Sequence, residues 1–390
     1  MVKGPGSRRY APVPQYAAAV RVALAGVGRM GSAIAGRLRA AGHRVKLYDP
    51  ALPEGESAPS LAAAARNSVI TFLCLPDAPA VQASLNGLAE AAPPIVVDLT
   101  SSLPSTTRRM AAALAPVGVE FLDSPLSGGV AGARLGTLTA MVGGDRDLLE
   151  RVRPVLATFA SNVRWAGPAG SGHATKALNN ALSAVSLMGT SELLVTAARH
   201  GGEEVAVVPA FNAGGARSQN SEVKFPRDVL PRTYGAGFTA GLMVKDLASA
   251  LTIAEERSAP ARFLAAVRAA WIEAAEAMGR EADFTRVHAV IDARGAPAAA
   301  RMGGADLDVL CRALAGINLI AAAEAMRVAA AEGLNRERVL GIVNTSTGRS
   351  EATRSRLAGN VDREALAAAA DLAREANVWA PLTEAASRCV

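Results

Sequence analysis

A glycine-rich turn between a strand-like and a helix-like segment constrains the fold of this chain more than any other feature. The apolar run VRVALA is followed by Gly26, Gly28 and Gly31 in a G-x-G-x-x-G pattern, and then by an alanine-rich amphipathic stretch. A second strand-like run, RVKLY, ends just before Asp49. Glycines permit a tight turn and a close approach of backbone to pyrophosphate, and the first N–H groups of a helix attract phosphate. Because strand, turn, helix and strand occur in this order, the pattern predicts a dinucleotide-binding site.

The alternation of strand-like and helix-like segments continues to about residue 167. Alternation of this kind predicts a parallel, doubly wound α/β sheet of the Rossmann type. From about residue 170 the strand signal vanishes, and the chain reads as amphipathic helices that begin with a long one over 173–199. The sequence therefore predicts a Rossmann domain followed by an all-α domain.

The end of the chain repeats part of this helical domain. Residues 191–218 align without gaps onto 323–350, and 251–263 can be laid on 370–382. A gapless register that ends in a shared Arg-Ser pair favours duplication over chance similarity of alanine-rich helices. The sequence predicts four segments: a flexible N-terminal arm over 1–19, a dinucleotide-binding domain over 20–167, a helical substrate and interface domain over 168–302, and a partial, degenerate repeat over 303–390.

The bulk composition excludes several classes of protein. A formal charge of +6 is spread along the chain without a basic stripe, so we expect no nucleic-acid partner. The four histidines and three cysteines are scattered, which favours a reducing cytoplasm and gives no metal site. We expect no membrane partner, because no apolar run approaches the roughly 20 residues of a membrane span.

Three polar residues interrupt the apolar pattern at the start of the long helix. Lys176, Asn179 and Asn180 lie three and four positions apart, so they share one helix face. Ser127 with Gly128 and Gly129 follows a predicted strand, where a hydroxyl and successive N–H groups form a nest for a carboxylate. A lysine can act as a general base only if its pKa falls toward neutrality, which burial and a second nearby cation would both promote.

The preferred dinucleotide follows from Asp49. A carboxylate at the end of the second strand accepts hydrogen bonds from ribose hydroxyls, whereas a 2′-phosphate is usually met by Arg, Ser or Asn. The segment YDPALPEGE contains acids and no such residue. The sequence therefore predicts NAD in preference to NADP.

Several of these segments together resemble the β-hydroxyacid dehydrogenase family. The matching segments are GVGRMGSAIAGRL, CLPD, DLTSSLP, DSPLSGGVAGARLGTLTAMVGG, GSGHATKALNN and GFTAGLMVKDL, in the family's order, over about residues 21 to 300. The resemblance implies that Lys176 is catalytic together with Asn180, and that Asn179 and the Ser127–Gly129 nest bind the substrate. It implies cofactor contacts at Gly26, Val27, Gly28, Arg29, Met30, Gly31, Asp49, Leu75, Pro76, Thr100, Ser101 and Lys245.

The resemblance implies an oxidoreductase that interconverts a small 3-hydroxy acid and the corresponding semialdehyde or keto acid. Alternatives are an imine reductase, a 6-phosphogluconate dehydrogenase-like enzyme and a non-catalytic protein that senses NAD. In the extended repeat register, Asp308 stands opposite Lys176, and Cys311 and Arg312 stand opposite the two asparagines. We therefore expect one active site per chain, in a homodimer or in a monomer whose second copy imitates a partner subunit.

Overall fold

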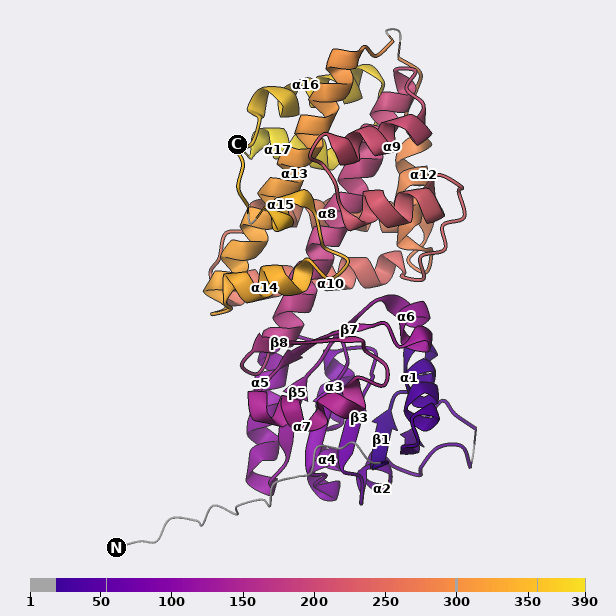
Figure 1. Ribbon diagram of the computed structural model, residues 1–390, viewed down its shortest axis with the longest axis vertical. Coiled ribbons are helices and arrows are strands. Elements are labelled where there is room, and N and C mark those ends of the chain that lie inside the picture. Colours follow the sequence, from indigo (N-terminus) through magenta and orange to yellow (C-terminus); the bar gives the residue numbers. More distant parts are fainter. Residues whose placement is uncertain (1–18, 54, 299–300, 356, 390) are drawn as a thin grey trace, which may run out of the picture.

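The computed structural model describes residues 19–53, 55–298, 301–355 and 357–389, so the predicted N-terminal arm lies almost entirely outside the described residues. A sheet-containing part and a helical part lie end to end (Figure 1). The longest helix, α8 (Ser171–Arg199), starts at the sheet and runs through the helical part.

The N-terminal part is a Rossmann-like domain built on one eight-stranded sheet. Its strands are β1 (Arg21–Ala25), β2 (Arg44–Tyr48), β3 (Ile70–Leu73), β4 (Ile95–Asp98), β5 (Glu120–Asp123), β6 (Leu126–Ser127), β7 (Thr139–Gly143) and β8 (Asn162–Gly167). Its helices are α1 (Arg29–Ala40), α2 (Leu61–Ala65), α3 (Ala78–Ala83), α4 (Leu85–Ala91), α5 (Pro104–Leu114), α6 (Gly129–Leu135) and α7 (Arg146–Leu156), with a 3-10 turn at Ala115–Val117. Both faces of the central strands are buried, because α1 packs its apolar stripe of Ile34, Ala35 and Leu38 on one side and Val81, Leu88 and Met110 cover the other.

The prediction of a parallel sheet is right for part of the sheet and wrong for the rest. The strand order is β2-β1-β3-β4-β5-β7-β6, with β8 paired to β7. The first five strands are parallel, but β7 is antiparallel to both β5 and β6 and parallel to β8. The reversal arises because the glycine-rich segment after β5 folds back through β6 and α6, a return that leaves no periodicity in the sequence.

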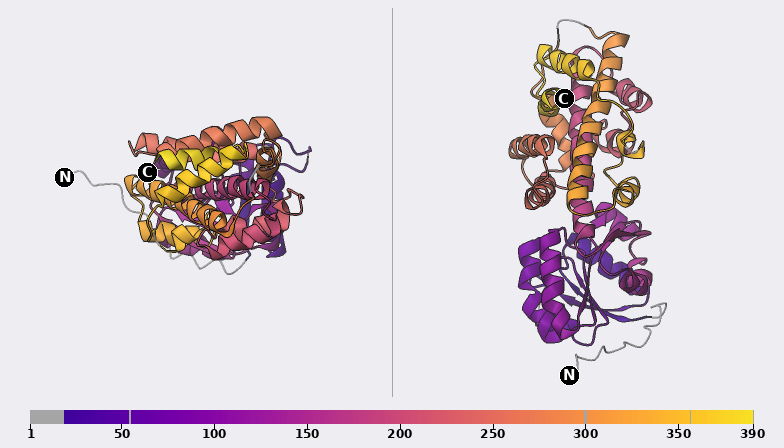
Figure 2. Two further views of the ribbon diagram at one scale, coloured as in Figure 1. Left: turned by 90° about the horizontal axis from the view of Figure 1, so that it is seen from above. Right: turned by 90° about the vertical axis from the view of Figure 1, so that its left-hand side faces the viewer.

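The C-terminal part of the described chain is helical. After α8 come α9 (Glu204–Ala213), a π-helix (Asn220–Val229), α10 (Ala240–Glu256), α11 (Arg262–Met278), a 3-10 turn (Phe284–Arg286) and α12 (Val287–Asp292). The last helices are α13 (Gly304–Ala331), α14 (Arg336–Val343), α15 (Glu351–Arg354), α16 (Arg363–Glu375) and α17 (Pro381–Arg388). Two long helices, α8 and α13, run side by side through this part (Figures 1 and 2).

The expectation that no apolar run approaches the length of a membrane span is wrong for these two helices. Both α8 and α13 are long and apolar enough by composition, but 94% and 67% of their most apolar windows are buried inside the protein. The apolar surface that resembles a membrane span is therefore the surface with which the helices pack on their neighbours.

Contacts between the two predicted copies come in matched pairs. Ser218 forms an antiparallel bridge with Ser350, its equivalent 132 positions later by the predicted register. The Glu192 carboxylate accepts hydrogen bonds from the first N–H groups of α17, at Leu382 and Thr383. Its counterpart Glu324 does the same for α11, at Phe263 and Leu264. Each predicted copy thus caps a helix of the other.

Candidate active site

The glycine turn after β1 has the geometry that a bound pyrophosphate requires. Gly26 has a φ of 89°, and a Cβ there would lie 2.2 Å from the Cys74 carbonyl oxygen. A Cβ on Gly31 would lie 2.0 Å from the carbonyl oxygen of Gly26, so the turn packs directly on α1. By contrast, no atom beyond the neighbouring residues lies within 4 Å of a Cβ on Gly28, which leaves that position open to a ligand. The remaining turn residues are Val27, Arg29 and Met30, of which the last two start α1.

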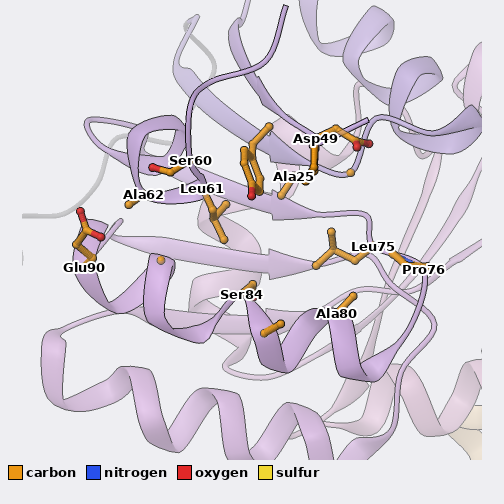
Figure 3. A pocket seen from close by; sticks show the side chains of 15 residues that line it. Ala25, Asp49, Ser60, Leu61, Ala62, Leu75, Pro76, Ala80, Ser84 and Glu90 are labelled. Atoms are coloured by element: carbon orange, nitrogen blue, oxygen red, sulfur yellow. The ribbon is translucent and has the colours of Figure 1, made fainter. Parts of the chain in front are cut away.

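A cavity of about 500 Å³ opens beside this turn, between the ends of β1, β2 and β3. Asp49 lies on one side and Leu75 with Pro76 on the other (Figure 3). The two Asp49 oxygens accept hydrogen bonds from the backbone N–H groups of Val27 (2.7 Å) and Ala51 (2.9 Å). An ionised carboxylate has about four lone-pair sites, so Asp49 retains acceptor capacity for a ribose hydroxyl. The residues present therefore fit the adenosine half of a dinucleotide.

The loops after β3 and β4 form the other end of the cofactor groove. The Thr100 hydroxyl accepts a hydrogen bond from the backbone N–H of Leu75 (3.0 Å), which holds the two loops together. From α10, the Lys245 ammonium donates long hydrogen bonds to the carbonyl oxygens of Pro76 (3.3 Å) and Ser101 (3.4 Å). Lys245 thus joins the helical part to both loops at the place where the predicted cofactor contacts meet.

The start of α8 is fixed to the sheet by Asp123, a residue to which the sequence analysis gave no role. Its carboxylate accepts hydrogen bonds from the backbone N–H groups of Gly170 (2.8 Å) and His173 (2.9 Å), and so caps the helix. A Cβ on Gly172 would lie 2.1 Å from the Met141 carbonyl oxygen, which shows how closely helix and sheet approach. One turn further on, the helix presents Lys176.

Lys176 faces a second cavity, of about 230 Å³, between the sheet and the helical part. Ser127, Gly128 and Gly129 line the same cavity, as does Asn180, so the structure brings the predicted nest and the predicted lysine together. The positive φ values of Gly128 (124°) and Gly129 (67°) turn the backbone at the nest in a way that other residues rarely adopt.

The environment of Lys176 favours loss of its proton. Only 7% of the residue is exposed, and no hydrogen bond or ion pair joins it to another part of the chain that the structure describes. Burial lowers the pKa of Lys176, the Asp246 carboxylate opposes this, and the Lys245 ammonium lowers the pKa further. A lysine that is deprotonated more easily than usual is suited to exchange a proton with a substrate hydroxyl.

The two asparagines beside Lys176 have different surroundings. Asn180 lines the cavity and donates a short hydrogen bond (2.5 Å) to Asp246 on α10. Asn179 does not line the cavity, although the sequence analysis expected it to bind substrate. It is fully buried behind Asn180, and its amide donates to Asn180 (3.1 Å) and to the Thr347 hydroxyl (2.9 Å).

The cavity also contains residues that sequence reasoning missed. Lys224 and Arg227, from the π-helix, add two cations to it, and Thr347 reaches it from the C-terminal copy. Lys224 donates to the side-chain oxygens of Gln219 (2.7 Å) and Asn220 (2.6 Å), which are neutral. The motif VKFPR was available as a signal, but nothing in the sequence places a π-helix there. Among the described residues, no group of three or more histidine, cysteine, aspartate or glutamate side chains could hold a metal ion.

A dinucleotide turn that leads to a cavity with a buried lysine defines a pyridine-nucleotide-dependent oxidoreductase. Comparison with known proteins agrees. Residues 21–167 match the model of the NAD binding domain of 6-phosphogluconate dehydrogenase, and residues 170–291 match the NAD-binding domain of NADP-dependent 3-hydroxyisobutyrate dehydrogenase. The chain is 34% identical to 2-hydroxy-3-oxopropionate reductase of Escherichia coli over 60% of its own length and 85% of that protein. It therefore belongs to the β-hydroxyacid dehydrogenase family and is an enzyme of hydroxy acids.

Two further comparisons bear on the substrate and on the C-terminal copy. The chain is 31% identical to 2-(hydroxymethyl)glutarate dehydrogenase of Eubacterium barkeri, over 62% of its own length and 84% of that protein. A structure of 6-phosphogluconate dehydrogenase from Plasmodium falciparum matches 95% of this chain and 91% of its own, with a TM-score of 0.69 and 16% identity. At that identity the likeness concerns the fold alone, but it extends over nearly the whole chain.

Proposed function

We propose that this enzyme interconverts a small 3-hydroxy acid and the corresponding semialdehyde or keto acid, with Lys176 as general acid and base. The observation that carries the proposal is the single cavity that holds Lys176, Asn180 and the Ser127–Gly129 nest. The nest would bind the substrate carboxylate, and Asn180 would orient the hydroxyl. During oxidation the Lys176 amine would take the hydroxyl proton. The glycine turn, Asp49 and the loops after β3 and β4 would hold the nicotinamide cofactor, which would supply the hydride-acceptor chemistry. In reduction the Lys176 ammonium returns the proton.

The test is a panel of hydroxy acids and semialdehydes assayed with NAD and with NADP, beside a fluorescence titration with NADH. Turnover of a 3-hydroxy acid supports the proposal. Tight NADH binding without turnover of any substrate would instead favour the non-catalytic sensor, and preferential turnover of imines would favour an imine reductase. We also keep the cytoplasm as the proposed location, since the three free cysteines suit a reducing compartment.

The proposed preference for NAD makes Asp49 a test residue. Asp49→Asn keeps an acceptor oxygen for the Val27 N–H but removes the negative charge that would repel a 2′-phosphate. We expect kcat/KM with NAD to fall about tenfold, as for loss of a hydrogen bond to a charged group, and kcat/KM with NADP to rise. Glu90→Gln is the matched control, because Glu90 lines the same cavity but pairs with Arg66 at the surface. An Asp49→Asn enzyme with an unchanged ratio between the cofactors would contradict the assignment.

Lys224 favours a substrate with a second acidic group, whereas the Arg227 guanidinium is already paired with Asp228 (2.6 Å). Lys224 is buried without a directly bonded carboxylate, and burial together with Arg227 lowers its pKa to about 7. A second carboxylate on the substrate would supply the missing partner. The relative named for 2-(hydroxymethyl)glutarate indicates that the family accommodates a hydroxy dicarboxylate.

Replacement of Lys224 tests this preference. Lys224→Met keeps an unbranched side chain in the buried site, and we expect KM for a hydroxy dicarboxylate to rise about tenfold, with KM for a monocarboxylate nearly unchanged. Lys46→Met, on β2 and outside the cavity, is the control. An equal rise in KM for both substrate classes would show that Lys224 maintains the shape of the cavity and does not select the substrate.

A further inference from the structure

A loop of the C-terminal copy reaches the cavity that contains Lys176. This loop, residues 344–350 between α14 and α15, brings Thr347 into the cavity wall. Two residues earlier, Thr345 accepts a hydrogen bond from Asn162 of the Rossmann-like domain (2.9 Å). The loop therefore lies between the sheet and α8, in contact with residues that are distant from it in the sequence.

A continuous chain of hydrogen bonds leads from this loop to the proposed catalytic residues. The Asn179 amide donates to the Thr347 hydroxyl (2.9 Å) and to Asn180 (3.1 Å). Asn180 in turn donates to Asp246 (2.5 Å), the carboxylate that acts on the pKa of Lys176. Since Asn179 and Asn180 are both buried, the orientation of the Asn180 amide depends on the partners of Asn179.

The next residue of the loop fixes the other side of Asn179. The backbone N–H of Gly348 donates to the Asn179 side-chain oxygen (2.9 Å). A Cβ on Gly348 would lie 2.5 Å from the Asn179 carbonyl oxygen, so only glycine allows the loop to approach this closely. The oxygen of Asn179 is thus occupied by the second copy, which leaves the amide nitrogen to bridge Thr347 and Asn180.

The equivalent loop of the first copy lies against α13, beside Arg312 and Ala315. There a cavity of about 280 Å³ is lined by Gly215, Arg312, Ala315 and Glu351, among others. By the register of 132 residues, these stand where Thr347, Asn180, Ser183 and Gln219 stand in the first cavity. Both cavities have therefore been formed by the same packing of a loop from one copy against the long helix of the other.

The second cavity lacks the residues that the reaction would need. Asp308 replaces Lys176, and Arg312 replaces Asn180 and is held in ion pairs with Asp308 (2.9 Å) and Asp362 (2.5 Å). The loop that faces it has Gly215 in place of Thr347 and so offers no hydroxyl. At this loop position, only the copy that faces Lys176 has a side chain, Thr347, and that side chain bonds to Asn179.

We propose that Thr347 is a positioning residue of the active site, and that the C-terminal copy completes this site within one chain by orienting Asn180 through Asn179. The proposal rests on the proposed function, because Asn180 is taken to orient the substrate hydroxyl. It assigns to the duplicated segment a part in substrate binding in addition to its packing on α8.

The experiment compares three variants of the full-length enzyme. Thr347→Val keeps the shape of the side chain and removes the hydroxyl, so KM for the hydroxy acid should rise about tenfold, with a smaller change in kcat and with NADH affinity within about twofold of wild type. Thr347→Ser restores the hydroxyl and should recover KM to within about twofold. Ser355→Ala, which removes a hydroxyl from the second cavity, should leave all three parameters unchanged.

The possible outcomes separate this inference from the function on which it rests. If the wild-type enzyme turns over no hydroxy acid, the proposed function fails. If it does so but Thr347→Val has the wild-type KM, or if Thr347→Ser is as impaired as Thr347→Val, the positioning role is overturned. A loss of NADH affinity in Thr347→Val would likewise overturn it, since that result would indicate a general change in how the two domains meet.

Discussion

Replacement of Lys176 by alanine is expected to lower kcat by about a thousandfold or more and to leave NADH affinity nearly unchanged. The expected size is that of general acid–base catalysis, to which is added the loss of a group that would hold the substrate hydroxyl. NADH affinity should persist, because the glycine turn, Asp49 and Leu75 lie on the Rossmann-like domain and none of them contacts Lys176. The measurement is steady-state turnover beside a fluorescence titration with NADH.

The pH dependence of the wild-type enzyme gives a second test of the same assignment. Alcohol oxidation needs the neutral amine, so its rate should rise with pH through the lowered pKa of Lys176, below the ordinary value of 10.5. Lys176→Arg keeps the positive charge but remains protonated at all accessible pH values, so it should be as inactive as Lys176→Ala. Near-normal turnover in either variant, or a rate that falls as pH rises, would contradict the role of Lys176 as the base.

Local patterns predicted those parts of the site that one segment of chain determines. The glycine turn followed from the steric needs of Gly26 and Gly31, each of which packs on a backbone oxygen. Lys176 could be identified because burial of a lysine on an otherwise apolar helix costs free energy, which indicates a functional role. The long helix that carries it was predicted within two residues of its observed start.

The parts that the sequence did not reveal depend on contacts between distant segments. Asn179 was expected to bind the substrate, but Thr347 and Gly348 come from 168 and 169 positions away and occupy its amide. Lys224 enters the cavity because its segment forms a π-helix, a rare conformation that the sequence pattern does not indicate. The antiparallel direction of β7 and the burial of α8 against α13 also arise from tertiary packing. The periodicity of a single segment cannot predict them.

The second large effect is expected from removal of the C-terminal copy. A chain that ends at residue 302 would lose α13, whose Leu314 and Ile317 pack on α8 at Gly189. It would expose an apolar face of α8, a helix whose most apolar window is now 94% buried. We expect this chain to be insoluble or to associate with itself, as seen by size-exclusion chromatography with light scattering, and to have lost activity together with Thr347.

Glu192 provides the matched point variant, because its carboxylate is one of the buried links between the copies. Loss of that carboxylate in Glu192→Ala would leave the N–H groups of Leu382 and Thr383 and the Thr383 hydroxyl without their acceptor. At about 1–3 kcal/mol for a buried donor left unpaired, the free energy of unfolding should fall by about 3 kcal/mol in total. Denaturant titration measures this change, and Glu384→Ala, a partly exposed acid on the same helix α17, should change it little.

These two experiments together decide whether the enzyme needs the C-terminal copy for its solubility and its activity. If the second copy takes the place of a partner subunit, Glu192→Ala should weaken the fold without changing the substrate preference, whereas truncation should remove both solubility and turnover. A soluble monomer of residues 1–302 with full activity would show instead that α8 needs no cover and that the cavity needs no residue from the copy. It would thereby contradict both the intrachain pseudo-dimer and the role of Thr347.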